Sequence, residues 1–392
     1  MMSPTPRTVA ASAGHLLELI RLRGGLSRQQ LLAETGMSRG TLYGRLDALA
    51  RLGFVYEAES LAATGGRPAR RIRFDDRGRV LLTVDLGQTH ARIAVTDLLG
   101  SELRRAVLPL DVAAGPAVVL GPVLEHAAKL LAVGATERLA GLGVGVPAPV
   151  DPTSGAIVRA TWPGWSSDVV ADSFGLRWSE PIVVENDARA AAVGESRSPD
   201  ETLVYVKLAT GLGCGVVVGG EVLRGARGFA GDIGHVRVAA AGPQPVCRCG
   251  RVGCLAAYSS GRALLGRLGS PVIDSLDGLV AAARAEDAQV LAELGAAADV
   301  LGTALATTVT TVNPDRLVLG GPLGVLPIVV DRVRQRIQLD VDERAWPRVE
   351  GSTLGGRATG RGLARLVVRR AFAPAAVDAA LAAGAPAPLR SG

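Results

Sequence analysis

The chain has 392 residues, of which 48% are hydrophobic and 20% charged, as in an ordinary globular protein large enough for two or three domains. Its N-terminal residues form no uninterrupted apolar stretch, and no segment reaches the roughly 18 consecutive apolar residues that span a bilayer. We therefore expect neither a signal peptide nor a membrane partner, and we expect the protein to lie in the cytoplasm.

The net charge of +6 is confined to the first fifth of the chain. Residues 1–74 hold eleven arginines and five acidic residues, whereas the rest of the chain holds 32 basic and 32 acidic residues. The protein uses arginine almost throughout, with only two lysines, Lys129 and Lys207. Scattered arginines are typical of a solvated face, but a segregated surplus indicates a surface that contacts nucleic acid.

The first 53 residues predict three helices. The first begins near Ala10 and ends at a pair of glycines, Ser27 and Gln30 form a capping box for the second, and Ser38 is a suitable N-cap for the third. A glycine turn separates the last two helices. This is helix-turn-helix geometry, in which the N-terminal end of the third helix enters the major groove of DNA.

The third helix and the hairpin after it supply the candidate DNA contacts. Leucines at helical spacing form an apolar stripe on the third helix, opposite its polar side chains. Residues 53–58 and 69–74 can pair as the strands of a β-wing, and an arginine between glycine and proline at its tip suits the minor groove. The expected DNA contacts are Ser38, Arg39, Thr41, Tyr43, Arg45 and Arg67. The alternative is a small interaction module that binds no DNA.

Beyond residue 80, the sequence predicts strands that end in glycine-rich turns. Two of these turns, DLGQT (residues 85–89) and TGLGCG (residues 210–215), combine glycines, which admit a phosphate to the backbone, with hydroxyl groups that donate to it. In the first turn, an aspartate can also hold water on Mg²⁺. Together with a later double glycine, they describe two similar lobes that close over a nucleotide. The expected phosphate contacts are Asp85, Gly87, Thr89, Thr210, Gly211, Gly213, Gly320 and Gly321.

A third motif, Glu185-Asn186-Asp187, joins an apolar strand to an alanine-rich helix between the two turns. Two interpretations stay open. Asn or Asp at this place is typical of a helix N-cap. Alternatively, Asp187 is a general base that takes a proton from a hydroxyl group attacking a γ-phosphate.

The order DxGxT, PxPVD, ENDA, TGxGxG, GH…CxCGxxGC and VLGG resembles the ROK family, named for repressors, open reading frames and kinases, from residue 80 to about 365. The segment before it, with TGGRPARR closing the wing, resembles the DNA-binding head of the family's repressor branch. The resemblance implies an α/β, two-lobed actin-like/ribonuclease-H-like ATPase fold of the sugar-kinase type, with an N-terminal winged helix-turn-helix domain. The expected divisions are the winged helix-turn-helix (1–76), a first lobe (80–194, completed by a C-terminal helix within 361–384), a second lobe with a zinc-binding loop (195–360) and a disordered tail (385–392).

The GH…CxCGxxGC element is the most specific part of the resemblance and holds three of the four cysteines within eight positions. In a reducing compartment, such a cluster is more often metal-binding or catalytic than disulfide-bonded. His235, Cys247, Cys249 and Cys254 offer one imidazole and three thiolates, a closed tetrahedral set suited to structural Zn²⁺. In the family, this zinc braces the sugar-site residues. The alternative is a set of buried free thiols.

In the family's glucokinases, the sugar is held by the ENDA asparagine and aspartate, by the GH histidine and by three further residues. This sequence departs from the family at all three, because Asp232 and Ala256 replace glutamates and Thr161 replaces an asparagine. A sugar hydroxyl facing Ala256 lacks a partner, at a cost of roughly 1–3 kcal/mol. DLGQT also has one glycine fewer than the usual pair. The implied sugar contacts are Asn186, Asp187, Asp232, His235 and Thr161.

Two functions follow from the resemblance. The first is a DNA-binding transcriptional regulator, a repressor of carbohydrate-metabolism genes, whose kinase-derived body senses a sugar or sugar phosphate. The alternative is an active ATP-dependent sugar kinase, glucokinase-like, with Asp187 as base and the head as an accessory. We favour the first because the head is complete while the sugar contacts are eroded. The implied partners are an operator in double-stranded DNA, the effector, and further copies of the chain in a homodimer or homotetramer. Zn²⁺ is the implied structural cofactor, and ATP with Mg²⁺ belongs to the alternative.

Overall fold

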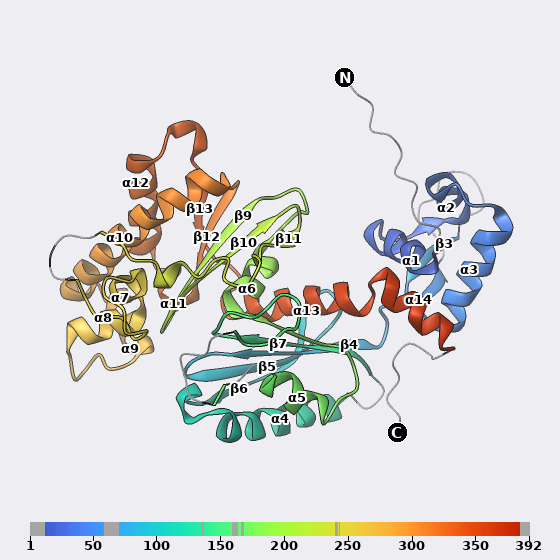
Figure 1. The fold of residues 1–392 in the computed structure, drawn as a ribbon, viewed down its shortest axis with the longest axis horizontal. Coiled ribbons are helices and arrows are strands. Elements are labelled where there is room, and N and C mark those ends of the chain that lie inside the picture. The colour runs from blue at the N-terminus through green and yellow to red at the C-terminus, as the bar shows by residue number, and fades with distance from the viewer. Residues whose placement is uncertain are drawn as a thin grey trace.

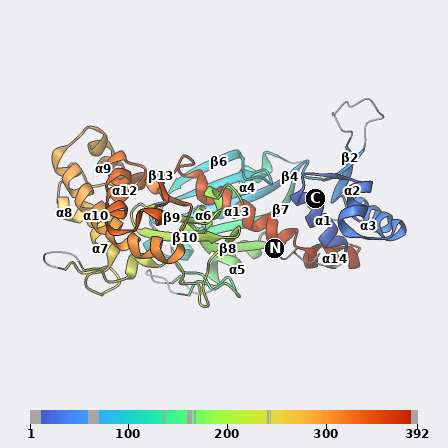
Figure 2. The ribbon, with the colours of Figure 1, turned by 90° about the horizontal axis from the view of Figure 1, so that it is seen from above.

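The computed structural model describes residues 12–58, 70–134, 137–158, 164–165, 168–239, 242 and 244–384. Within them, the chain forms a three-stranded sheet of order β1-β3-β2 and two five-stranded sheets, β6-β5-β4-β7-β8 and β11-β10-β9-β12-β13. Figure 1 shows the two larger sheets side by side in the body of the molecule, with the small sheet and its helices at one end. Seen from above in Figure 2, the molecule is elongated, with this N-terminal unit and helices α8–α10 at opposite ends.

The N-terminal unit has the helices and hairpin strands that the sequence predicts. It comprises α1 (Ala13–Leu22), α2 (Arg28–Thr35), α3 (Arg39–Arg51), β1 (Leu26–Ser27), β2 (Val55–Ala58) and β3 (Arg71–Phe74). The capping box of Ser27 and Gln30 is present, and Ser38 accepts the hydrogen bond from Thr41 N that begins α3. β2 and β3 pair antiparallel, as expected of wing strands. The first helix begins at Ala13, after its N-cap Ser12. The wing tip with Arg67 lies outside the described residues.

The first lobe is built on the sheet β6-β5-β4-β7-β8. Its elements are β4 (Arg79–Leu86), β5 (His90–Thr96), β6 (Glu102–Pro109), η1 (Val112–Ala114), α4 (Pro116–Ala132), β7 (Arg138–Val146), α5 (Val169–Gly175) and β8 (Ile182–Asn186). β4 is buried along its whole length because both faces of the sheet are covered there. Leu82 and Val84 pack into the core of the first lobe, whereas Leu81 points to the opposite face and joins the core shared with the N-terminal unit.

The second lobe is built on the sheet β11-β10-β9-β12-β13. Its strands are β9 (Leu203–Leu208), β10 (Leu212–Val218), β11 (Glu221–Val222), β12 (Arg316–Gly320) and β13 (Arg348–Gly351). Its helices are η2 (Ile233–His235), α7 (Leu255–Ser259), α8 (Gly261–Leu268), α9 (Leu276–Arg284), α10 (Ala288–Val312), α11 (Gly321–Gly324), α12 (Pro327–Asp340) and η3 (Glu343–Ala345). Among the described helices, α10 alone is long and apolar enough to cross a membrane by length and composition, but Leu294, Leu301 and Leu305 bury it in the core of this lobe.

Two helices pack between the large sheets. α6 (Asp187–Glu195) covers the second-lobe sheet, and α13 (Arg357–Ala371) covers the first-lobe sheet. The two helices approach until their backbones touch, at Gly194 and Gly362. A methyl group on either glycine would overlap a backbone carbonyl oxygen, that of Ala358 or that of Ala190. The lobes are therefore joined by close helix packing that tolerates no larger residue at these two positions.

The C-terminal region differs in part from the sequence expectation of one helix within 361–384 that completes the first lobe. α13 does pack on that lobe, but it begins at Arg357 and ends at Ala371. A second helix, α14 (Pro374–Ala382), packs instead on α1, where Gly14 N donates to Asp378 Oδ1 at 2.8 Å. The proline at the first position of α14 lacks the N–H that a continuous helix requires, so the chain turns there. The expected tail, 385–392, lies outside the described residues.

The N-terminal unit is held to the first lobe by an aromatic junction. The ring of Phe372 packs edge-on against Phe54 and Phe74, with centroid distances of 6.3 and 4.9 Å. The buried guanidinium of Arg79 lies 5.7 Å from the ring centres of Phe54 and Phe372 and donates to Gly53 O at 2.8 Å. This junction lies where β4 begins and α13 ends, so both elements lead from the N-terminal unit into the body.

Replacing Phe372 with alanine is expected to lower the free energy of unfolding by about 3–5 kcal/mol, because it opens a cavity under two rings. Urea and thermal unfolding followed by circular dichroism would measure this loss. Leu99→Ala is the matched control, since the Leu99 side chain is 72% exposed and its removal should change the free energy little. Equal stability of Phe372→Ala and wild type would contradict the assigned junction.

Candidate functional site

A cavity of about 650 Å³ lies between the two lobes, within the size range of small-molecule sites. On the side of the first lobe, the wall is formed by the ends of β4 and β8. On the side of the second lobe, it is formed by the β9–β10 turn, η2 and the start of α8. The structure brings most of the expected sugar and phosphate contacts to its wall. These are Asp85, Gly87, Thr89, Asn186, Asp187, Thr210, Gly211, Gly213, Asp232, His235 and Gly321.

Of the expected contacts that the structure describes, Gly320 alone does not line the cavity. Thr161 lies outside the described residues. Gly320 lies behind the wall, where a side chain would overlap the hydroxyl group of Tyr205. Gly320 therefore allows β12 to pack against β9 and does not face the cavity, whereas Gly321 does.

Both interpretations of the Asn186-Asp187 motif have a structural counterpart. Asn186 is the N-cap of α6, and its Oδ1 accepts from Arg189 N at 3.0 Å. Asp187 is the first residue of the helix, and its Oδ1 accepts from Ala188 N at 2.8 Å and from Asn186 Nδ2 at 3.2 Å. The second oxygen of Asp187 points to the cavity and accepts from Lys207. Asn186 therefore caps the helix, and one carboxylate oxygen of Asp187 faces the cavity.

The ammonium of Lys207 is a central feature of the cavity that sequence reasoning missed. Its Nζ lies 2.8 Å from Asp187 Oδ2 and 3.8 Å from Asp85 Oδ2. Burial raises the pKa of Asp187, and the Lys207 ammonium opposes that rise. Although burial favours the neutral amine, the two carboxylates hold the pKa of Lys207 above its ordinary value. The sequence did offer a signal for Lys207. It is one of only two lysines in the chain, and it lies on an apolar strand that leads into a predicted phosphate turn.

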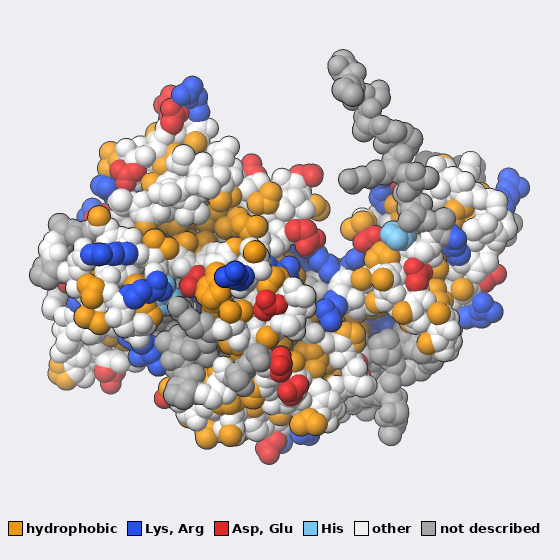
Figure 3. Space-filling model, viewed as in Figure 1, with side chains coloured by type: hydrophobic (Ala, Val, Ile, Leu, Met, Phe, Trp, Pro, Cys, Tyr) orange, Lys and Arg blue, Asp and Glu red, His pale blue; other side chains and the backbone are white. Residues whose placement is uncertain are grey.

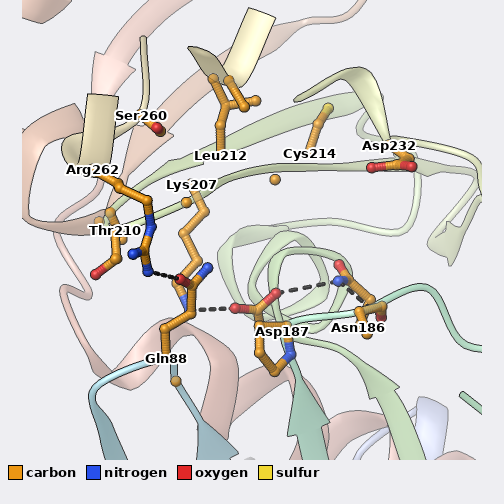
Figure 4. Close-up of a pocket in the computed structure, with 18 of the residues that line it drawn as sticks. Gln88, Asn186, Asp187, Lys207, Thr210, Leu212, Cys214, Asp232, Ser260 and Arg262 are labelled. Carbon is orange, nitrogen blue, oxygen red and sulfur yellow. Dashed lines mark hydrogen bonds and ion pairs between the residues drawn. The ribbon is translucent and has the colours of Figure 1, made fainter. Parts of the chain in front are cut away.

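A second polar link joins the lobes beside the glycine turns. Arg262 Nη2 of α8 donates to Gln88 Oε1 of the first turn at 3.1 Å (Figure 4). The Gln88 amide also covers the second turn, because a methyl group on Gly211 would lie 2.8 Å from Gln88 Nε2. Burial, reinforced by the nearby Arg248 guanidinium, lowers the pKa of Arg262. The glutamine side chain therefore occupies the space between the two turns.

A buried charge network holds the wall of the cavity near Asn186. Glu185 lies 2.8 Å from Arg189 Nε and accepts from Arg224 Nε at 2.7 Å. Arg189 also donates to Gly228 O at 2.8 Å and to Val150 O at 3.1 Å, which ties a loop of each lobe to the start of α6. Breaking such a pair leaves a buried charge without a partner, so this wall is expected to be rigid.

His235, Cys247, Cys249 and Cys254 form a cluster with the geometry of a metal centre. Their ligand atoms all lie within 4.8 Å of one another, with His235 Nδ1 3.6 Å from Cys247 Sγ and Cys249 Sγ 3.7 Å from Cys254 Sγ. With Zn–S bonds of about 2.3 Å, a tetrahedral ion requires ligand separations of about 3.8 Å. The donor set and its spacing therefore fit Zn²⁺.

The thiols of this cluster differ in acidity. Although burial opposes it, hydrogen bonds from Arg251 and the neighbouring thiols lower the pKa of Cys249 to about 6. Burial, together with the neighbouring sulfurs, raises the pKa of Cys254 to about 12. Thiolates are the ligands of zinc, so metal binding must displace the remaining protons. Cys214 lies apart from the cluster, and burial raises its pKa to about 12, as for an unreactive core thiol.

The polar side chains of α3 divide into exposed and capping groups. Arg39 and Tyr43 are exposed, and the guanidinium of Arg28 lies 5.5 Å from the centre of the Tyr43 ring. Ser38 and Thr41 share a hydrogen bond of 2.9 Å at the start of the helix, so their hydroxyl groups serve its cap. Arg45 is half-buried and donates to a methionine sulfur. Figure 3 shows several Lys or Arg side chains on the visible face of this unit.

The sequence matches the ROK family over residues 81–370. The chain belongs to the ROK family. The xylose repressor of Bacillus subtilis (strain 168) is 26% identical over 364 residues, which cover 90% of this chain and 94% of that protein. Since the family segment is residues 81–370, the likeness extends beyond it into the N-terminal unit.

Solved structures give the same result for the fold. The crystal structure of a ROK family transcriptional regulator, a homologue of the E. coli MLC protein, matches with a TM-score of 0.77 at 23% identity and covers 95% of this chain and 98% of its own. A ROK family glucokinase from Streptomyces griseus, in complex with glucose and AMPPNP, matches with a TM-score of 0.62 at 28% identity, covering 73% of this chain and 98% of its own. The expected fold class, a two-lobed sugar-kinase type, is confirmed.

Removal of one cluster ligand is expected to abolish tight metal binding. The purified chain should retain about one equivalent of zinc after dialysis against a weak chelator, whereas Cys247→Ser should lose it, because three ligands no longer close the tetrahedron. Elemental analysis measures the difference. Cys214→Ala is the control, since it removes a buried cysteine outside the cluster and should leave the zinc in place. Undiminished zinc in Cys247→Ser would refute the assignment.

Proposed function

We propose that this protein is a sugar-responsive transcriptional regulator, a repressor, that binds operator DNA through its N-terminal unit and a small effector between its lobes. The observation that carries this proposal is that β4 and α13 each run from the inter-lobe cavity to the aromatic junction of the N-terminal unit. A change of lobe angle at the cavity would therefore be transmitted directly to the part of the protein that carries α3.

The two elements have the length and rigidity that such coupling needs. β4 starts at the buried Arg79 of the junction and reaches Asp85 at the cavity. α13 starts beside Gly356, which lines the cavity, and ends one residue before Phe372. At 1.5 Å per residue, the 15 residues of α13 span about 22 Å. A ligand that prefers one lobe angle can act only through its different affinity for the two states.

A homodimer or homotetramer would convert a lobe rotation into a change of DNA affinity. Two copies of α3 must enter half-sites about 34–36 Å apart, one helical turn of DNA. Since a two-fold oligomer presents two identical heads, a modest rotation of each moves the recognition helices out of register. In this proposal, the protein acts in the cytoplasm on double-stranded DNA near carbohydrate-metabolism genes.

Zinc would act as a structural brace in this proposal. His235 belongs both to the metal cluster and to the cavity wall. A tetrahedral ion with four protein ligands has no open position for chemistry, so it would fix the loop 235–254 and with it one side of the effector pocket. The sugar contacts proposed from the cavity geometry are Asn186, Asp187 and Asp232.

A sugar kinase is the second candidate, because Asp187 and most residues of both glycine turns line the same cavity. In that function, Asp187 would take the proton of an attacking sugar hydroxyl, and ATP with Mg²⁺ would supply the phosphoryl group. One measurement distinguishes the regulator from the kinase. Release of ADP in the presence of common hexoses, lost in Asp187→Ala, would favour the kinase.

Exposed side chains of α3 are expected to determine DNA affinity. Arg39→Ala and Tyr43→Ala should each weaken operator binding by about five- to 100-fold, because a lost base or phosphate contact costs about 1–3 kcal/mol. Arg67→Ala should mainly reduce the preference for A·T-rich flanks. Gel-shift titration at fixed ionic strength measures both effects. Arg344→Ala is the control, since that side chain is 86% exposed on the far lobe. If none of the three substitutions matters, the DNA-binding proposal fails.

The cavity carboxylate is expected to control the response to sugar and not the affinity for DNA itself. In fluorescence anisotropy with labelled operator, D-xylose or D-glucose should release wild-type protein, whereas Asp187→Asn should bind the operator normally and respond at least about tenfold more weakly. Asp274→Asn, an exposed aspartate of the second lobe, serves as control. An Asp187→Asn protein with an undiminished sugar response would contradict the proposed effector site.

A further inference from the structure

We propose that Lys207 is a built-in cation that takes the place of a divalent metal ion between Asp85 and Asp187, so that the cavity binds an uncharged sugar without nucleotide. This inference rests on the proposed sugar-sensing function and names the ligand class of the same site.

The Lys207 ammonium lies between two carboxylates that come from different elements. Asp85 lies at the end of β4 in the first lobe, and Asp187 lies at the start of α6. Two carboxylates that face one gap are the usual ligands of a hard divalent cation. Here Lys207 reaches into the gap from β9 of the second lobe, at 2.8 Å from Asp187 Oδ2 and 3.8 Å from Asp85 Oδ2. A divalent ion in the same gap would meet the ammonium as a like charge.

The second observation is the side chain that separates the two glycine turns. Gln88 extends from the first turn over Gly211 of the second and accepts from Arg262 at 3.1 Å. A chain of phosphates can use the backbone N–H groups of these turns only when the glutamine is displaced. Figure 4 shows this link and the Lys207–Asp187–Asn186 hydrogen bonds as two separate groups of contacts. The first closes the phosphate side, and the second fills the cation position.

The charges that remain define the ligand. Beside Lys207, two carboxylates and one ammonium leave one net negative charge, which disfavours a phosphate in that part of the cavity. The arginines of the wall, Arg248, Arg262 and Arg267, belong to the second lobe, so this preference applies only to the space between Asp85 and Asp187. Asp85 is only 9% exposed, and its Oδ1 has no hydrogen-bond partner among the described residues. Because Oδ1 is fully buried, the acceptors that a donor on the ligand can reach in this gap are the Oδ2 atoms of Asp85 and Asp187 beside Lys207. Sugar hydroxyls are such donors and carry no charge.

Lys207 also changes what Asp187 can do. A carboxylate that accepts from an ammonium at 2.8 Å is a good hydrogen-bond acceptor for a hydroxyl group. To act as a general base, the same carboxylate would have to take up a proton beside that ammonium, which favours its charged form. Lys207 therefore makes Asp187 a binding residue and works through it as a positioning residue.

The test titrates the full-length, zinc-loaded protein with Mn²⁺ alone and with Mg·AMPPNP, by electron paramagnetic resonance and calorimetry. Wild type should bind neither with a dissociation constant below about 1 mM. Lys207→Met, which keeps the length of the side chain and removes the charge, should bind Mn²⁺ at least about tenfold more tightly than wild type. Lys207→Met combined with Gln88→Gly should show the same gain for Mg·AMPPNP.

Lys129→Met is the matched control, because Lys129 is the chain's other lysine and is exposed on α4. It should behave as wild type in both titrations. Binding of Mg·AMPPNP to wild type below about 1 mM would overturn the proposal, as would Lys207→Met that folds normally and binds Mn²⁺ no more tightly. If the variants fail to fold, the titrations of the wild-type protein still test the proposal.

A third arm tests the ligand class by thermal shift with D-xylose, D-glucose and D-glucose 6-phosphate. The uncharged sugars should stabilise the wild-type protein, and the phosphate should do so at least about tenfold more weakly at equal concentration. Stabilisation by the phosphate alone would overturn the inference. Operator release by D-glucose 6-phosphate in the anisotropy assay would still leave the regulator proposal standing, so the two failures can be told apart.

Discussion

The contact between α6 and α13 is the constraint on which the rest of the molecule depends. The backbones of the two helices are in contact at Gly194 and Gly362, where neither helix has room for a side chain. One of them begins with Asp187 at the cavity, and the other continues to the aromatic junction of the N-terminal unit. A side chain at either glycine would force apart the two sheets that these helices cover. The cavity, the two lobes and the N-terminal unit therefore all depend on the same contact between α6 and α13.

Local signals explain why the N-terminal unit could be predicted closely. Its helices begin at Ser27 and Ser38, whose side chains cap them, and its leucines repeat at helical spacing. The grouping of His235 with Cys247, Cys249 and Cys254 was predictable for a different reason, since all four residues lie close together in the sequence. In each case, the residues that interact are close in sequence, so the pattern itself carries the information.

The cavity chemistry depends on contacts between distant segments, which no local pattern displays. Lys207 and Asp85 are separated by more than a hundred residues, as are Arg262 and Gln88. The glycine turns predicted where the cavity lies, but not that a lysine and a glutamine would reach into it from opposite lobes. The division of the C-terminal region into α13 and α14 was missed for the same reason, because the last helix packs mainly on α1, which is distant in sequence.

A regulator has a physical reason to bind a sugar without converting it. The effector shifts the equilibrium between two lobe angles only while it occupies the cavity, and only by its difference in affinity for the two states. A cavity that transferred a phosphoryl group would release a changed ligand after each turnover, so occupancy would depend on nucleotide as well as sugar. An ammonium between Asp85 and Asp187, as we propose for Lys207, would remove that dependence, and it lies where β4 and α6 reach the cavity. Lys207, which in our proposal selects the ligand, thus lies beside Asp85 on the strand that leads to the N-terminal unit.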